Sequence, residues 1–69
     1  MEWKSGTAVY QSEVTTKHGM TFQVELRHNP NGMWQAYFKN LNVHIATTEY
    51  NSDVAALSEI KAKLEAHGW

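Results

Sequence analysis

The sequence lacks cysteine, contains a single proline, and carries charge on only 19% of its 69 residues. Without cysteine, the protein can form neither disulfide bonds nor thiolate metal and redox sites, a composition that favours a reducing, cytoplasmic location. No apolar run approaches the roughly 20 residues of a membrane-spanning helix, and the first residues lack the apolar segment of a signal peptide. We therefore expect a cytoplasmic protein without a membrane partner.

The charge balance is close to neutral, with six Lys and Arg against seven Asp and Glu and a formal net charge of -1. A nucleic-acid-binding domain of this size typically concentrates positive charge, so the balance disfavours DNA or RNA as the main partner. The length is that of one domain, spanning residues 1–69, in which residues 1–6 are expected to form a flexible N-terminus. So short a chain buries only roughly 60% of its unfolded surface, which leaves its stability marginal.

Residues 7–48 are rich in Val, Thr, Tyr and Phe and alternate between apolar and polar side chains, as half-buried strands do. Four strands are predicted, because turn-forming residues interrupt the alternation three times. The core-facing residues are expected to be Ala8, Tyr10 and Val14 in the first strand, Met20, Phe22, Val24 and Leu26 in the second, Trp34, Ala36 and Phe38 in the third, and Leu41, Val43 and Ile45 in the fourth.

The turns constrain how these strands pair, because residues opposite one another must lie on the same face. Val14 opposite Phe22 leaves a three-residue loop at 17–19, with Gly19 in the left-handed conformation. The second turn, 29–32, needs an odd loop of three or five residues, which places Leu26 opposite Trp34 or Ala36. The third turn is predicted at 39–40 or slightly longer, with the third-strand apolar residues facing those of the fourth.

Beyond residue 51 the apolar period changes to that of an amphipathic helix, with Val54, Leu57, Ile60 and Leu64 on one side. Asn51 or Ser52 is expected to cap its N-terminus, and Gly68 to end it in a Schellman motif that places Trp69 against Leu64. The predicted fold class is α+β: a four-stranded antiparallel meander sheet with one C-terminal helix packed on its apolar face (ββββα).

No catalytic or metal-binding constellation is predicted. The four histidines, His18, His28, His44 and His67, show neither helical nor alternate-strand ligand spacing. No nucleophile, base and orienting group are expected to meet in a pocket, and the glycines do not form a phosphate-binding loop. We therefore expect a protein that is not an enzyme and has no catalytic residues, no metal and no cofactor.

The predicted surface offers a polar sheet face and two open sheet edges. Tyr37 is the one outward aromatic residue of the central strands, and residues 42–48 form a nearly uncharged edge, which is poorly defended against pairing with another strand. We expect a protein partner or a second copy of the chain to bind there, with nucleic acid on the outer face as the less favoured alternative. The candidate partner-binding residues are Arg27, Gln35, Tyr37, Lys39, His44 and Thr47.

A family resemblance extends from Phe22 to Leu64. It is carried by residues 31–41 (NGMWQAYFKNL), 46–48 (ATT) and 52–57 (SDVAAL), which follow the order of a strand, an Asn-Gly turn, a strand ending in Leu, a short strand and an Ala-rich helix. In this order the chain resembles the N-terminal domain of HicB-type antitoxins. It departs from that pattern at Lys39-Asn40, where the family has Pro-Asp, at Glu49-Tyr50, where it has Gly, and in its extra N-terminal strand.

The resemblance implies a protein that binds and masks a small RNA-cleaving toxin and assembles with itself. Autoregulation by DNA binding is not implied, because the C-terminal DNA-binding segment of full-length members has no counterpart in this sequence. Together with the absence of a catalytic constellation, this gives the expected function: a small, non-catalytic protein-binding module, such as an antitoxin-like or inhibitor-type regulator. A nucleic-acid-associated regulator is the alternative, and a small enzyme subunit is a distant third.

Overall fold

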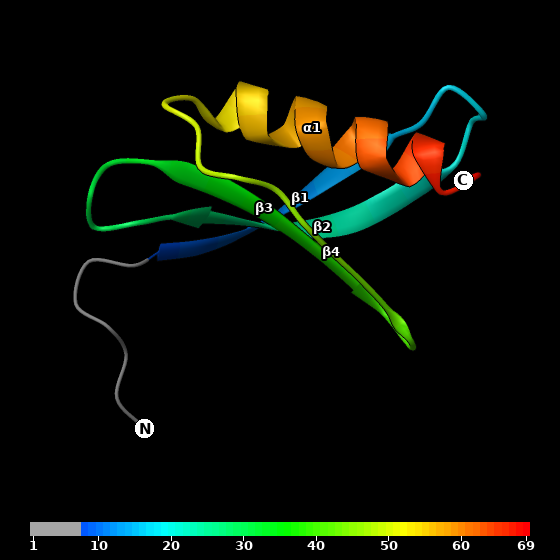
Figure 1. Ribbon diagram of the computed structural model, residues 1–69, viewed down its shortest axis with the longest axis horizontal. Coiled ribbons are helices and arrows are strands. Elements are labelled where there is room, and N and C mark those ends of the chain that lie inside the picture. The colour runs from blue at the N-terminus through cyan, green and yellow to red at the C-terminus, as the bar shows by residue number, and fades with distance from the viewer. Residues whose placement is uncertain (1–7) are drawn as a thin grey trace.

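The computed structural model describes residues 8–69, so the predicted flexible segment 1–6 lies outside the described residues. Four strands, β1 (Ala8–Thr15), β2 (Thr21–His28), β3 (Trp34–Asn40) and β4 (Val43–Ala46), form one antiparallel sheet in the order β1-β2-β3-β4. One helix, α1 (Asp53–Ala66), lies across one face of the sheet, and the other face carries no element of the described chain (Figure 1). The predicted ββββα meander is confirmed.

The first two hairpins form as predicted. Val14 pairs with Phe22, and Thr16 N donates to Met20 O at 2.8 Å, which leaves the loop 17–19 with Gly19 at φ 86°. In the second hairpin Leu26 pairs with Ala36, one of the two predicted registers, around a turn that ends at Gly32. Both glycines have the positive φ that residues with a Cβ rarely adopt, which explains why these turns form where they do.

The third turn differs from the prediction. It lies at residues 41–42, because Asn40 pairs with Val43 and Phe38 pairs with Ile45. Leu41 is therefore not a core residue: it is 87% exposed and has a φ of 47°. The predicted faces of Val43 and Ile45 are correct, because a change in pairing by an even number of residues keeps the same face inward.

The helix begins and ends as predicted. The Ser52 side chain accepts a hydrogen bond from Val54 N at 3.2 Å, and Asp53 lies in the first turn, where the helix dipole favours an acidic residue. At the other end Trp69 N donates to Leu64 O at 3.1 Å, and Gly68 has a φ of 98°. These are the features of a Schellman ending, which turns the chain back onto the sheet.

The core lies between the sheet and α1. Trp69, Phe22, Ile45 and other half-buried apolar side chains pack around it. The buried core residues are Val14, Val24, Leu26, Ala36 and Phe38 from the sheet and Ala56, Ile60 and Leu64 from the helix.

Besides Leu41, three residues predicted to face the core are largely exposed. Val54 is 69% exposed. The buried side of α1 contains Ala56 and Ile60, and Val54, two positions before Ala56, lies about 200° around the helix, on nearly the opposite side. Tyr10 is on the predicted face but 50% exposed, since α1 packs mainly against β3 and leaves that part of β1 uncovered. Met20 is 49% exposed because it precedes β2.

Within residues 8–69, no helix is long and apolar enough to cross a membrane.

Candidate functional site

Five of the six predicted partner-binding residues lie together on the outer face of the sheet, the face opposite α1. We call these residues, Arg27, Gln35, Tyr37, Lys39 and His44, the face cluster. Arg27 on β2 pairs with Gln35 on β3, and Lys39 on β3 pairs with His44 on β4, with Tyr37 between them. Strand alternation puts all five side chains on one face, since directly paired residues share a face and residues two apart along a strand do as well.

The centre of the face cluster is a chain of contacts across three strands. The Arg27 guanidinium lies 4.9 Å from the centroid of the Tyr37 ring, a cation–π arrangement. The Tyr37 hydroxyl lies 2.9 Å from His44 Nδ1, at hydrogen-bonding distance. Tyr37 is thus held on one side by β2 and on the other by β4, which orients an aromatic side chain on an otherwise polar surface.

The electrostatics of this face are balanced. Arg27 Nη2 donates to Glu25 Oε1 at 3.1 Å, and the two side chains are 43% and 39% exposed. An ion pair this exposed adds little to stability, typically ~0–1 kcal/mol. Arg27 Nε is buried and has no hydrogen-bond partner among the described residues. The guanidinium therefore keeps donor capacity that its pairing with Glu25 does not use.

Thr47, the sixth predicted residue, is buried, with 4% of its surface exposed. Its Oγ1 accepts a hydrogen bond from Ala36 N at 3.0 Å and donates to Thr48 O at 2.8 Å, and its backbone N donates to Ala36 O. Gln35 Nε2 also donates to Thr47 O at 3.0 Å. Thr47 therefore continues the pairing of β3 past the end of β4 and does not share the surface position of the face cluster.

The open edge of β4 adjoins the face cluster. In an antiparallel pair, alternate residues direct their backbone groups toward the neighbouring strand. Thr47 N donates to Ala36 O, so the backbone groups of Thr47 are directed toward β3. Counting back along the strand by twos, those of Ile45 and Val43 are directed toward β3 as well. The backbone groups of the residues between them, His44 and Ala46, are directed toward the open edge. His44 and Ala46 are both exposed, and no described strand lies beside this edge of β4, so their N–H and C=O groups have no strand partner in the described chain.

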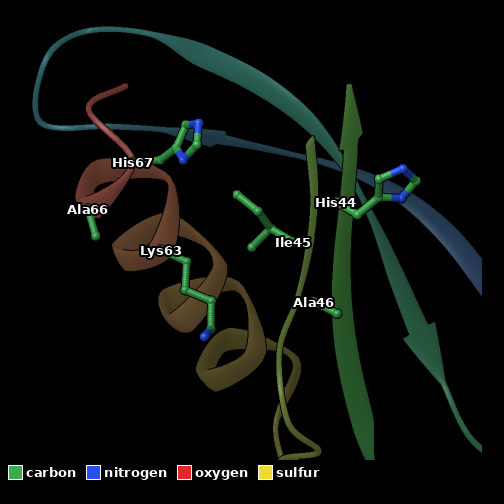
Figure 2. A pocket seen from close by; sticks show the side chains of 6 residues that line it. All are labelled: His44, Ile45, Ala46, Lys63, Ala66 and His67. Atoms are coloured by element: carbon green, nitrogen blue, oxygen red, sulfur yellow. The ribbon is translucent and has the colours of Figure 1, made fainter. Parts of the chain in front are cut away.

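A groove lies beside this edge, between β4 and the C-terminal half of α1. Figure 2 shows the Ile45 side chain directed toward the helix and the His44 side chain directed to the opposite side of the strand. No carboxylate lines the groove, and its helix side carries Lys63 and His67. The lining residues are His44, Ile45, Ala46, Lys63, Ala66 and His67.

Glu59 lies one helical turn before Lys63 and is held by three neighbours. The Tyr50 hydroxyl donates to its carboxylate, Lys63 Nζ lies 3.4 Å from Oε2, and Thr48 Oγ1 donates to Oε1 at 3.3 Å. The Tyr50 hydrogen bond, with further contributions from Lys63 and Thr48, holds the pKa of Glu59 below its ordinary value although desolvation opposes this. The carboxylate is thereby tied to the segment after β4.

Three of the histidines each contact a different aromatic side chain. His28 stacks on Trp34 with ring centroids 4.0 Å apart, His44 bonds to Tyr37, and His67 lies edge-on to Trp69 at 4.5 Å. Among residues 8–69, no three His, Asp or Glu side chains are grouped to hold a metal ion.

The fold and its surface define a small α+β domain whose exposed features are a sheet face and a sheet edge. No family model matches the chain, and neither a curated protein nor a solved structure is significantly similar to it.

The sequence identified the face cluster and the open edge but not the groove. The strand alternation was sufficient to identify the face cluster, and the scarcity of charge around β4 was sufficient to identify the open edge. The groove depends on where α1 crosses the sheet, and only the packing of Ile60 and Leu64 against the sheet decides that position. A partial signal was present, because Lys63 and His67 are four residues apart and therefore lie on the same side of the helix.

Proposed function

We propose that this protein is a small, non-catalytic protein-binding module, an inhibitor-type or antitoxin-like regulator, that contacts its partner through the outer face of its sheet and the adjoining β4 edge. The observation that carries the proposal is the orientation of Tyr37 by Arg27 and His44. A Tyr held in one conformation on a solvent-exposed face loses little further side-chain entropy on binding, and Tyr and Arg are enriched among the residues that dominate binding energies.

The architecture supports a binding surface of this kind. The outer face of β2, β3 and β4 is not covered by any described element. It presents polar side chains that can form hydrogen bonds, including both acidic and basic residues. The resemblance of residues 22–64 to the N-terminal domain of HicB-type antitoxins adds support, since that resemblance implies a protein that masks a partner. Fold-level likeness supports topology more than function, so the proposal depends on the face cluster.

The same face is less suited to nucleic acid. A sheet that binds single-stranded RNA typically stacks bases on several outward aromatic side chains. On the described outer face the aromatic side chains are Tyr37 and His44, which are bonded to each other, and Glu25 sits directly opposite Tyr37 on β2. Binding driven by phosphates would have to overcome this carboxylate, and we therefore favour a protein partner.

The proposal is tested by affinity capture from a lysate of the native host with three versions of the tagged chain. The wild type is compared with Tyr37→Ala, which removes the centre of the face cluster, and with Glu13→Ala, a matched control on the exposed outer side of β1. We expect the wild type and Glu13→Ala to retain the same protein, and Tyr37→Ala to retain at least about tenfold less, as the loss of a central Tyr predicts.

We also expect the captured protein to stay bound to the tagged chain as the salt concentration is raised. A partner bound through shape and apolar contact stays bound at moderate salt, whereas capture through phosphates weakens steeply. Capture that is equal for all three versions would contradict the proposal, as would recovery of nucleic acid alone.

A further inference from the structure

The β4 edge and the groove beside it form a single surface, and its chemistry indicates what binds there. We propose that the partner contributes an extended acidic segment that pairs with β4 as a fifth strand and places alternate apolar side chains in the groove between β4 and α1. This inference rests on the proposed function and specifies the partner segment that such a module takes.

The backbone of β4 offers the first element of recognition. His44 and Ala46 direct their N–H and C=O groups to the open edge, and the side chains of both are exposed. A segment added to a sheet edge gains its affinity from such main-chain hydrogen bonds and its specificity from pockets that receive every second side chain. Four to five residues of a partner suffice to span an edge as short as β4.

The groove supplies the second element. A residue of the added strand that lies level with Ile45 directs its side chain to the helix side of the sheet, because neighbouring residues across two strands share a face. There it meets Ile45, whose side chain is directed toward the helix (Figure 2), and Ala66, which also lines the groove. An aliphatic side chain fits these neighbours.

Charge supplies the third element and selects the partner. Lys63 lines the groove on one side of the edge, and Lys39 lies beside His44 on the other. The nearby carboxylate of Glu59 is bound by Tyr50, Thr48 and Lys63. Because successive side chains of a strand point to opposite faces, the two neighbours of an apolar residue in the groove face Lys39 and His44 on the outer side of the sheet. Carboxylates at these two positions complement the Lys39 side chain.

The same charges argue against a second copy of the chain as the occupant. In a symmetric pairing of β4 with β4, the Lys39 side chains of both copies would lie on one face of the joined sheet and the Lys63 side chains on the other. β4 itself carries no acidic residue to offset positive charge gathered along this seam, and self-repulsion disfavours such a pairing. Self-association through this edge is therefore an alternative outcome of the test.

The experiment uses the full chain and three terminally blocked seven-residue peptides. The first alternates Glu and Val, the second alternates Lys and Val, and the third is the Glu/Val peptide with N-methyl groups on alternate backbone nitrogens of the edge-pairing side. Binding is followed by amide chemical shifts at low salt. We expect saturable binding of the Glu/Val peptide with shifts at His44 and Ala46, and binding at least about tenfold weaker for the other two peptides.

Three substitutions test the site from the side of the protein. Lys39→Glu reverses the charge on the outer face, which the Glu side chains of the peptide meet, and Lys61→Glu makes the same change at an exposed position of the helix, on the other side of the sheet. We expect Lys39→Glu to weaken binding of the Glu/Val peptide about five- to tenfold, and Lys61→Glu to have less than a twofold effect. Ala46→Pro, which removes an N–H directed to the open edge, is expected to abolish binding while β3 pairing is kept.

Several results would overturn the inference. They are the absence of Glu/Val peptide binding, equal binding of the Lys/Val peptide, shifts centred on β1, an equal effect of Lys61→Glu and Lys39→Glu, and a concentration-dependent dimer that hides His44 and Ala46. If the inference fails in this way while capture of a partner still depends on Tyr37, the proposed function stands and only the partner segment is wrong. If capture does not depend on Tyr37, the proposed function fails as well.

Discussion

The Tyr37 hydroxyl on β3 and the Nδ1 atom of His44 on β4 lie 2.9 Å apart on the outer face of the sheet. The pair is exposed, so the hydrogen bond contributes at most about 1 kcal/mol to stability. We expect Tyr37→Phe to change the free energy of unfolding by less than about 1 kcal/mol, measured by urea denaturation, and yet to weaken partner capture. A large loss of stability would show that this contact serves the fold.

The core is expected to reject charge at its centre. Ile60 and Phe38 are 0% and 5% exposed, so Ile60→Asp and Phe38→Asp each bury a carboxylate without a partner. The cost exceeds the few kcal/mol by which so small a domain is stable, and both variants are expected to lose the far-UV circular dichroism of the folded chain. Val54→Asp is the control, because Val54 is 69% exposed and its variant is expected to stay folded.

Thr47 is expected to be a structural residue. Thr47→Val keeps the shape of the side chain but leaves Ala36 N without its side-chain acceptor, and Ala36 is fully buried. An unsatisfied buried donor costs about 1–3 kcal/mol, which urea denaturation measures directly. Thr48→Val, at the exposed neighbouring position, is expected to cost less than about 0.5 kcal/mol. Equal effects at the two positions would refute this role for Thr47.

The turn between β3 and β4 holds Leu41 in the left-handed region, with φ at 47°. A residue with a Cβ in this region lowers the stability of the folded chain by roughly 1–2 kcal/mol, and glycine restores part of that stability. Because Leu41 is 87% exposed, its side chain contributes little packing in return. Leu41→Gly is expected to raise the free energy of unfolding by about 0.5–1 kcal/mol, whereas Leu41→Ala, which keeps the Cβ, is expected to give no gain.

Glu59 is expected to make stability depend on pH. Its pKa is lower in the folded chain than the ordinary value of 4.5, chiefly because the Tyr50 hydroxyl donates to the carboxylate. The contribution is therefore complete at neutral pH, and it is lost as the pH falls from the ordinary pKa through the lower folded-state pKa. Urea denaturation between pH 7 and pH 3 is expected to show a smaller loss for Glu59→Gln than for the wild type. Parallel curves for the two proteins would contradict this assignment.

The sequence by itself determined the number of strands, the face on which most strand side chains lie, and both ends of α1. These follow from local chemistry: alternation assigns a face, Gly19 and Gly32 supply the positive φ of two turns, and Ser52 and Gly68 cap the helix. The same alternation placed Arg27, Tyr37 and His44 on one face before any contact between them was known.

Only the tertiary structure decided the pairing of β4 and the position of the helix. Alternation cannot distinguish registers that differ by an even number of residues, so the placement of Ile45 opposite Phe38, and with it the exposure of Leu41, depended on packing. Likewise, an apolar stripe shows that a helix is buried on one side but not over which strands it lies. The groove between β4 and α1 exists because α1 settles mainly over β3, where Ile60 and Leu64 are completely buried.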